Sequence, residues 1–311
     1  MVNGYWLVEP KNTSRSINYI INYTKSWMKK LKKARKSKYP PVKLGLFLSS
    51  LCVLIYAYFI EPNWIEINSL QLTLPHLATE FDEYKIVQIS DIHVNKWMTQ
   101  ARLKRIFRLV NQQKPDAIAI TGDFITRRQE RFIPNLTATM GQLVAQDGKF
   151  GVLGNHDYWS NPDAVSHAMA QTNVFNLANT FQSIQRGDAK LYIAGVDDIY
   201  VGKDRLDLVM QSLPDDGNAA ILLAHEPDFA DTSAATGRFD LQLSGHSHSG
   251  QVRIPFFPPL HLPELGRKYY AGLHHLGSMM VYTNRGLGVT GMHLRFNCRP
   301  EITVITLNGK K

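Results

Sequence analysis

The chain has 311 residues, of which 44% are hydrophobic and 20% charged, so it is long and apolar enough for one large domain or two small ones. This composition excludes a disordered or collagen-like protein. The two cysteines, Cys52 and Cys298, are too few for a disulfide framework or a thiolate zinc site. The net charge of +9 is unevenly placed: residues 1–43 hold eleven Lys or Arg and one acid, and the rest holds 24 basic and 25 acidic residues. We therefore expect no nucleic-acid binding by the chain beyond this basic arm.

The basic arm, residues 1–43, carries apolar side chains at roughly helical spacing among its lysines. They are Ile17, Ile20, Ile21, Trp27 or Met28, and Leu31. This spacing predicts a basic amphipathic helix on an anionic membrane surface, and a disordered basic tail fits the pattern equally well.

Residues 44–60 form a run of 17 residues without a charge, bounded by Pro40-Pro41 and Glu61-Pro62. The run predicts a single transmembrane helix, although a buried core helix is the alternative. A cleaved signal peptide fits less well, because 43 residues precede the run and no small-x-small cleavage site follows it. We expect an uncleaved anchor in the cell membrane.

The flanking charges predict the orientation of that anchor. Nine Lys or Arg and no acid lie between Lys25 and Lys43, whereas Glu61 and Glu66 follow the run. The positive-inside rule then places the N-terminus in the cytoplasm and the remainder of the chain on the extracytoplasmic side.

Beyond residue 80, short apolar runs alternate with helical patterns. The runs are 84–90, 117–121, 150–153, 191–194, 221–224 and 241–244, and the helix candidates are 101–111, 136–145 and 163–172. This alternation predicts an α/β domain over residues 80–308, joined to the anchor by a linker at 61–79. Residues 252–268 contain four prolines and predict an apolar loop.

Polar side chains follow five of these runs. They are Asp91 and His93; Asp123; Asn155, His156 and Asp157; His225; and His246 and His248. The carboxyl ends of strands in an α/β sheet gather ligands, so we expect these side chains to converge. A histidine such as His225, taken alone, is more often a surface or core residue, but the ordered set of carboxylate, imidazole and amide groups favours a divalent transition metal.

Taken in order, these motifs resemble the calcineurin-like metallophosphoesterase superfamily over about residues 80–308. They are Asp91-x-His93, Gly122-Asp123, Gly154-Asn155-His156-Asp157, His225 and Gly245-His246-x-His248. The anchor followed by Glu61-Pro62, the run 245–251 and Gly286-Leu287-Gly288 resemble the membrane-associated bacterial phosphodiesterase branch. The resemblance implies a four-layer αββα sandwich that holds two divalent transition-metal ions, with Mn, Fe and Zn as the candidates.

The same resemblance implies a role for each site residue. Asp91, His93, Asp123 and His248 would hold one ion, and Asp123, Asn155, His225 and His246 the other. A hydroxide between the two ions would attack phosphorus in line. His156 would face the substrate as a hydrogen-bond donor or general acid. Asp157, Asp197 and Asp198 would orient imidazoles or, alternatively, form caps and turns.

These features predict a membrane-anchored enzyme that hydrolyses a phosphodiester or a pyrophosphate. The substrate could be linked to a lipid. The run 122–127 lacks the second aspartate of the protein-phosphatase branch, so we do not expect a phosphoprotein substrate. One alternative is a UDP-diacylglucosamine pyrophosphatase of lipid A synthesis, whose loop at Phe256, Phe257 and Leu260 could contact acyl chains but which needs a cytoplasmic active site. Another is a non-catalytic, metal-stabilised binding or scaffold protein, which the intact Asp123, Asn155 and His156 disfavour.

Overall fold

The structure is a computed structural model that describes residues 25–26, 29 and 41–310. Most of the basic arm predicted for residues 1–43 lies outside the described residues. The chain divides into two compact units, Met1–Leu54 and Ile55–Lys311, and each is described by itself.

The apolar run expected at 44–60 is helical. Helix α2 spans Pro41–Ile55, a π-helical turn η1 covers Tyr56–Ile60, and a 3-10 turn η2 covers Glu61–Asn63. The helical stretch Gly45–Asn63, with a mean hydropathy of 1.6, is the one helix within residues 41–310 long and apolar enough to cross a membrane. Pro62 cannot donate a backbone hydrogen bond, which is consistent with the helix ending there.

Two six-stranded mixed sheets form the centre of the second unit. The first sheet has the order β1-β12-β2-β3-β4-β5, with strands β1 (Glu66–Leu74), β12 (Glu301–Gly309), β2 (Tyr84–Ile89), β3 (Ala117–Thr121), β4 (Gly148–Val152) and β5 (Val174–Asn176). The second sheet has the order β10-β11-β9-β8-β7-β6, with strands β10 (Gly272–Leu276), β11 (Met279–Thr283), β9 (Leu241–Ser244), β8 (Ala220–Leu223), β7 (Ala189–Gly195) and β6 (Thr180–Arg186). The α/β class expected from the sequence is confirmed.

Helices and short helical turns connect these strands. The longer helices are α3 (Gln100–Gln112), α4 (Ile133–Met140), α6 (Pro162–Gln171), α7 (Leu206–Ser212) and α8 (Ala230–Ala235). The short ones are η3 (Thr79–Phe81), η4 (Glu130–Phe132), α5 (Asn155–Tyr158), η5 (Pro227–Phe229) and η6 (His248–Gly250). Thr99 begins α3 by accepting a hydrogen bond from the backbone N–H of Arg102, as an N-cap residue does.

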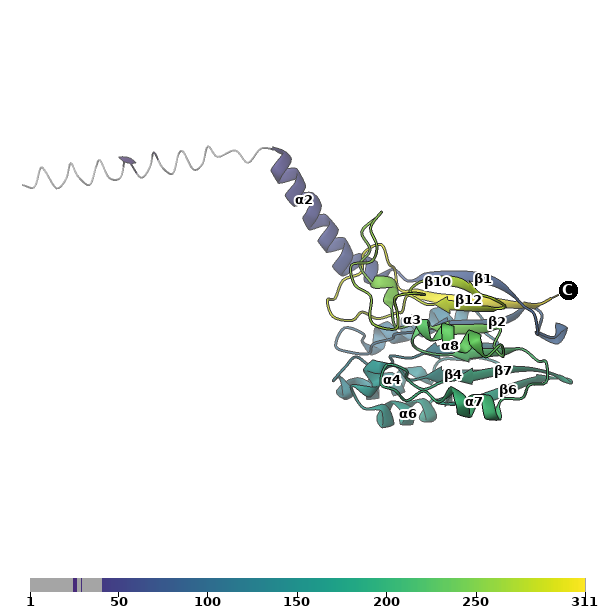
Figure 1. The fold of residues 1–311 in the computed structure, drawn as a ribbon. Helices are drawn as coiled ribbons and strands as arrows, with labels where there is room; N and C mark the ends of the chain where they lie inside the picture. The colour runs from purple at the N-terminus through teal and green to yellow at the C-terminus, as the bar shows by residue number, and fades with distance from the viewer. Residues whose placement is uncertain (1–24, 27–28, 30–40, 311) are drawn as a thin grey trace, which may run out of the picture. The chain divides into compact units, whose positions relative to one another are not determined.

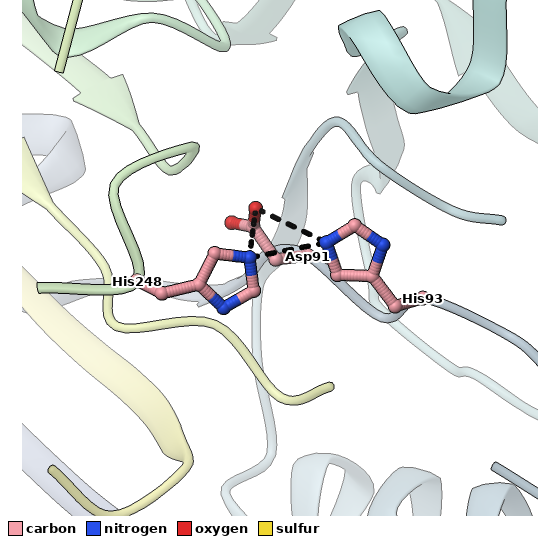
Figure 2. A group of neighbouring side chains, drawn as sticks. All are labelled: Asp91, His93 and His248. Carbon is pink, nitrogen blue, oxygen red and sulfur yellow. Dashed lines mark hydrogen bonds and ion pairs between the residues drawn. The ribbon is translucent and has the colours of Figure 1, made fainter. Parts of the chain in front are cut away.

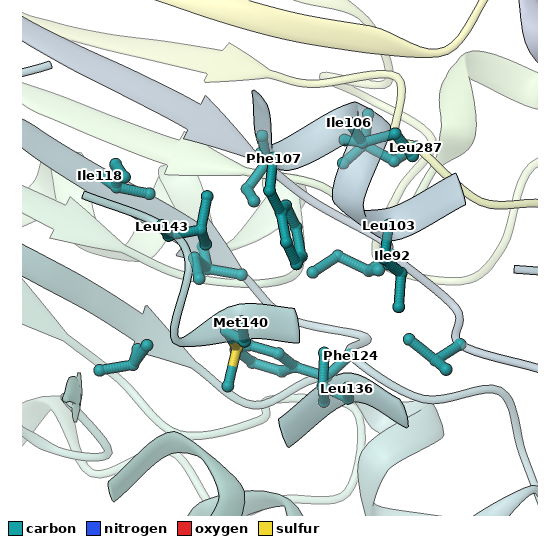
Figure 3. Packing of buried hydrophobic residues seen from close by; sticks show 14 of the residues in the cluster. Ile92, Leu103, Ile106, Phe107, Ile118, Phe124, Leu136, Met140, Leu143 and Leu287 are labelled. Carbon is teal, nitrogen blue, oxygen red and sulfur yellow. The ribbon is translucent and has the colours of Figure 1, made fainter. Parts of the chain in front are cut away.

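The period-two alternation of the strands divides their side chains between hydrophobic clusters. In β3, Ile118 packs with Phe107 of α3 and Leu136 of α4 (Figure 3), whereas Ala117 and Ala119 belong to the cluster between the two sheets. A third cluster joins the second sheet to α7 and α8. The side chain of Phe107 is fully buried, so its truncation to alanine should lower the free energy of unfolding by about 3–5 kcal/mol. This packing attaches α3 to the first sheet.

Residues 61–79 differ from the linker that the sequence suggested, because they contribute β1 to the first sheet. Strand β1 pairs in parallel with β12 from Glu66 opposite Glu301 to Leu74 opposite Gly309, so the two ends of the second unit lie side by side (Figure 1). The alternation of Leu70, Leu72 and Leu74 fits this strand, but its partner lies at the far end of the sequence. Local pattern alone therefore could not show the pairing.

Candidate metal centre and catalytic site

Strand ends from both sheets deliver the predicted ligands to one place. Asp91 and His93 follow β2, Asp123 follows β3, and Asn155 begins α5 after β4. His225 follows β8, and His246 and His248 follow β9. Strands β2, β3 and β4 are parallel neighbours, as are β8 and β9, so their carboxyl ends meet at shared sheet edges.

Asp91, His93 and His248 form a tight buried cluster, here named the first ligand group (Figure 2). The Nε2 atoms of His93 and His248 are 3.1 Å apart. Oδ1 of Asp91 lies 3.2 Å from Nε2 of His248 and 3.8 Å from Nε2 of His93. Three potential metal donors therefore face one small volume.

Asn155, His225 and His246 form the second ligand group. Nδ1 of His246 lies 3.1 Å from Oδ1 of Asn155 and 3.3 Å from Nε2 of His225. Asp123 stands between the groups, because its Oδ2 is 3.4 Å from Nε2 of His93 and also 3.4 Å from Nε2 of His225. All seven predicted ligands are thus brought together, with Asp123 in contact with both groups.

The donor atoms of this cluster fit divalent cations. Imidazole nitrogens face one another in His93 with His248 and in His225 with His246, an arrangement in which lone pairs repel unless a proton or cation lies between them. Oδ1 of Asp91 is buried and accepts no hydrogen bond. Such an orphaned carboxylate oxygen is costly unless a cation compensates it. The mix of imidazole, carboxylate and amide oxygen suits a transition metal.

Protonation favours the ligand forms of most of these groups. Burial lowers the pKa of His93, and it lowers the pKa of His246 to about 4, so both rings are neutral at pH 7. Burial alone would raise the pKa of Asp91 and Asp123, but the neighbouring histidines outweigh it and hold both carboxyl pKa values below their usual range. At His225, Asp123 outweighs burial and raises the pKa, so without a metal a proton competes for this position.

Backbone carbonyls select the ring nitrogen that faces the centre. Nδ1 of His225 lies 2.7 Å from the carbonyl oxygen of Thr121, and Nε2 of His246 lies 2.8 Å from that of Glu264. A nitrogen that donates to a carbonyl carries the proton, which leaves the lone pair on the opposite nitrogen. In the neutral form of each ring, the lone pair therefore points toward the other ligands.

The loops that carry the ligands have an unusual backbone. Asp91, His93, Asp123, His246 and His248 all have positive φ, with values from 47° to 66°. Each such residue costs about 1–2 kcal/mol, and strain of this kind concentrates at functional sites. Five of the seven predicted ligands therefore occupy conformations that the surrounding structure must enforce.

Glycines leave the space that these loops need. A Cβ at Gly245 would collide with Ser90 and Asp91, and a Cβ at Gly154 would collide with Asp123. The glycines of the two motifs thus permit close approach of the strand ends.

Asp157 accepts hydrogen bonds from backbone N–H groups and not from an imidazole ring. Its carboxylate accepts hydrogen bonds from the backbone N–H groups of Gly154, Phe124 and Ile125 at 3.0–3.2 Å, and burial and Asp123 raise its pKa to about 8. Asp197 accepts a hydrogen bond from the hydroxyl of Tyr158, and Asp198 accepts one from the backbone N–H of Val201. Of the two roles that the sequence left open for these aspartates, the contacts support the structural one.

His156 lies beside the centre and lines a cavity of about 690 Å³ together with Asp123, Asn155 and His246. Nδ1 of His156 accepts a hydrogen bond from the backbone N–H of Arg127 at 3.2 Å, so the proton of the neutral ring is on Nε2. Burial lowers the pKa of His156, which keeps the ring neutral at pH 7. Its position and tautomer suit a hydrogen-bond donor.

Arg295 is a buried residue behind the first ligand group that the sequence did not reveal. Its Nη2 donates to the carbonyl oxygens of Gly286 and Gly288 at 3.0 and 2.6 Å and lies 3.4 Å from Nδ1 of His248. The backbone N–H of Gly288 donates to the carbonyl oxygen of Asp91 at 2.7 Å. The run Gly286-Leu287-Gly288 was the available signal for this segment.

The chain matches known proteins over the same region. The model of the calcineurin-like phosphoesterase family matches residues 84–250, which contain every predicted ligand. The uncharacterized metallophosphoesterase YkuE of Bacillus subtilis is 37% identical over 261 residues, covering 82% of this chain and 89% of that protein. Phosphodiesterase YaeI of Escherichia coli is 26% identical over 256 residues, covering 81% and 92%. The transmembrane protein with metallophosphoesterase domain of Danio rerio is 28% identical over 256 residues, covering 78% and 57%.

The comparisons agree with the resemblance inferred from the ordered motifs. The family match spans more than half of the chain, and YkuE is similar over nearly its whole length. The buried donor cluster at the strand ends supplies the metal-binding capacity that such an enzyme requires. This chain therefore belongs to the calcineurin-like phosphoesterase family and is a metal-dependent phosphoester hydrolase.

Proposed function

We propose that the chain is a membrane-anchored phosphoesterase that hydrolyses a phosphodiester or pyrophosphate with two divalent transition-metal ions. The observation that carries this proposal is the place of Asp123, whose Oδ2 is equidistant, at 3.4 Å, from a histidine of each ligand group. The catalytic domain would comprise residues 80–308 together with β1 (Glu66–Leu74), and the anchor at 44–60 would precede it. The three hydrophobic clusters around two sheets support a four-layer αββα arrangement for it.

Each ligand group would hold one ion. Asp91, His93 and His248 would bind the first ion and Asn155, His225 and His246 the second, with Asp123 shared between them. The ions would supply Lewis-acid activation of water and of the phosphoryl oxygens. Asn155 offers a neutral amide oxygen, which limits the negative charge that faces an anionic substrate.

His156 would act on the phosphoryl group. Its backbone N–H donates to Oδ1 of Asp123 at 2.9 Å, which fixes the residue beside the shared ligand. Nε2–H is the free donor of the ring, so it can hydrogen-bond to the developing negative charge or give its proton to the leaving oxygen.

The anchor would hold this domain outside the cytoplasm. Residues 25–43 carry nine Lys or Arg and no acid, which favours a cytoplasmic N-terminus. A reporter enzyme fused after Lys311 should therefore be active only outside the cytoplasm, and cytoplasmic activity would contradict this orientation.

Metal analysis and turnover test the proposal together. The purified full chain should bind about two transition-metal equivalents and hydrolyse bis-p-nitrophenyl phosphate with Mn, Fe or Zn, and chelation should abolish both. One equivalent in fully active enzyme would contradict the shared role of Asp123. Metal binding without turnover on any phosphoester would favour the scaffold alternative.

A further inference from the structure

The cavity beside the metal centre is much larger than a phosphoryl group requires. Its volume of about 690 Å³ is in the range that encloses a drug-sized ligand. Apolar side chains line the same cavity: Val252, Leu260, Leu262, Met292 and Leu294. Hydrolysis at phosphorus gives no reason for this wall, so it points to an apolar part of the substrate.

The wall continues into an exposed apolar rim. The ten residues 254–263 contain no Asp, Glu, Lys or Arg. Phe256 is fully exposed, and Phe257, Leu260 and Met292 are each between 65% and 71% exposed. Leu260 and Met292 also line the cavity, and Phe256 and Phe257 belong to the same loop as Leu260. Large exposed apolar side chains grouped beside a cavity mark a surface that meets an apolar partner.

One segment joins the cavity to the end of the apolar helix. Thr290, Gly291, Met292 and Leu294 line the cavity, and the residues that follow contact η1. The backbone N–H of Arg295 donates to the carbonyl oxygen of Ala57 at 3.0 Å, and the ring of Phe296 contacts Tyr56. Val252, at the start of the exposed loop, forms a β-bridge with Phe296. Residues 290–296 therefore link the cavity wall to η1, and the bridge from Val252 to Phe296 links the exposed loop to the same segment.

The end of the helix adds its own exposed apolar side chains to this surface. Tyr58, Phe59, Ile60 and Trp64 are each between 43% and 63% exposed. Aromatic residues of this kind concentrate where a membrane-spanning segment leaves the hydrocarbon. The apolar partner that this edge would meet is the lipid bilayer.

We propose that the substrate is a membrane lipid phosphoester. Its phosphoryl group lies at Asp123, and its hydrocarbon chain runs along the Leu260 and Met292 wall toward the bilayer. The headgroup faces Trp159, Tyr200 and Arg267, which line the cavity with the ligands. This inference rests on the proposed phosphoesterase activity and names the substrate class of the same site.

A series of alkyl phosphates tests the wall without knowledge of the headgroup. Ethyl, butyl, hexyl and octyl phosphate are used as inhibitors of bis-p-nitrophenyl phosphate hydrolysis by the full chain in lipid nanodiscs. The inhibition constant should fall at least about twofold per added methylene, below the ceiling of about fourfold for complete burial. In the double variant Leu260→Ser/Met292→Ser, the decrease in the logarithm of the inhibition constant per methylene should be less than half of the wild-type value. This comparison does not depend on the turnover rate of the variant.

The control variant Val144→Ser/Phe175→Ser removes exposed apolar side chains that do not line the cavity, and it should keep the full dependence. Partition of inhibitor into the nanodisc is common to all variants, so a difference between variants reports the wall itself. Inhibition constants independent of chain length, or an equal dependence in the Leu260→Ser/Met292→Ser variant, would overturn the inference.

Failure of the proposed activity would give a different result. If no metal supports hydrolysis of the nitrophenyl ester, the proposed function is contradicted, and the chain-length dependence is then measured by calorimetric binding of the same alkyl phosphates to the metal-loaded protein. Affinity that rises with chain length, and does so less in the variant, would support the lipid-binding wall. Flat affinity would reject it.

Discussion

The two ligand groups hold similar donor atoms by different means. In the first group, Asp91, His93 and His248 all have positive φ, and the guanidinium of Arg295 lies behind His248. In the second group only His246 has positive φ, and backbone carbonyls hold the imidazoles of His225 and His246. The first group thus depends on strained loops and the second on the strand ends themselves.

This difference indicates where the centre can be disturbed selectively. The first group depends on residues 285–298, because Gly288 donates to the carbonyl oxygen of Asp91 and Arg295 gathers the surrounding carbonyl groups. The second group has no such dependence among these contacts. Damage to the late segment should therefore affect one metal site before the other.

The largest effect is expected where the two groups are joined. Asp123→Asn removes a charged ligand from both, so metal content should fall below one equivalent and kcat/KM by at least about 10³-fold. Elemental analysis and hydrolysis of bis-p-nitrophenyl phosphate measure both changes. Asp231→Asn, which disrupts an exposed ion pair with Lys268, is the control and should behave as the wild type. Full metal content in the Asp123→Asn variant would contradict the proposal that the two ligand groups share Asp123.

His156→Ala should separate catalysis from metal binding. We expect kcat to fall about 10²–10⁴-fold, the range for a lost proton donor or charge stabiliser, while both ligand groups keep their metal. A general acid matters less when p-nitrophenolate leaves than when an alkoxide leaves, so a smaller defect with the nitrophenyl ester would identify that role. Equal defects would identify charge stabilisation, and loss of metal would place His156 among the ligands.

Arg295→Met tests the dependence of the first group on the late segment. The change leaves buried carbonyl oxygens without donors, at a cost of about 3 kcal/mol or more. Metal content should fall from about two equivalents toward one, because only the first group loses its support. The matched control is Arg238→Met, since the buried Arg238 also donates to carbonyl groups, those of the half-buried Pro214 and Asn218, outside the centre. Equal loss of both ions from the Arg295 variant would contradict the asymmetry.

The smallest effect concerns the ion pair that supports Arg285. Burial by itself raises the pKa of Glu301, but Arg285, 2.6 Å away, and Tyr282 outweigh it and hold the pKa below its usual range. A depressed carboxyl pKa stabilises the fold above the unfolded-state pKa, and this stability is lost as the pH falls through the folded pKa. Glu301→Gln should therefore cost about 1–3 kcal/mol at pH 7 and nearly as much at pH 5, and the cost should decrease as the pH falls below the ordinary carboxyl pKa of 4.5 and through the folded pKa.

Urea unfolding at each pH measures this difference. Exposed Glu130→Gln is the control and should show no such dependence. A cost for Glu301→Gln that is constant from pH 7 to pH 3 would mean that the charge of Glu301 contributes nothing.

The ligand positions could be predicted from sequence because each follows an apolar run. The runs at 84–90, 117–121, 221–224 and 241–244 match β2, β3, β8 and β9 closely. A strand end with a short polar motif is a local signal. The helix expected at 136–145 is shifted, since α4 begins at Ile133, next to Pro134 in the first turn where proline is favoured.

Arg295 and β1 could not be predicted because their roles depend on distant contacts. An isolated arginine in a loop has no periodicity, and nothing local shows that Arg295 lies behind His248, 47 residues away in the sequence. Strand β1 likewise pairs with β12 from the far end of the second unit. Such long-range pairing is set by the whole fold. The positive φ of the ligand residues could not be predicted either. Glycine is the usual sequence signal for positive φ, and none of these ligands is glycine.

The turn η2, which follows the apolar helix, is hydrogen-bonded to the rest of the catalytic unit. Glu61, which is buried, accepts hydrogen bonds from the backbone N–H groups of Asn297 and Cys298, and Arg102 donates to Pro62 and Asn63. The turns η1 and η2 directly follow residue 55, so no long flexible linker separates it from β1. On a membrane, an enzyme anchored by residues 44–60 would meet a membrane-bound substrate by diffusion in two dimensions. Its turnover would then follow the surface density of the substrate and depend little on the bulk concentration.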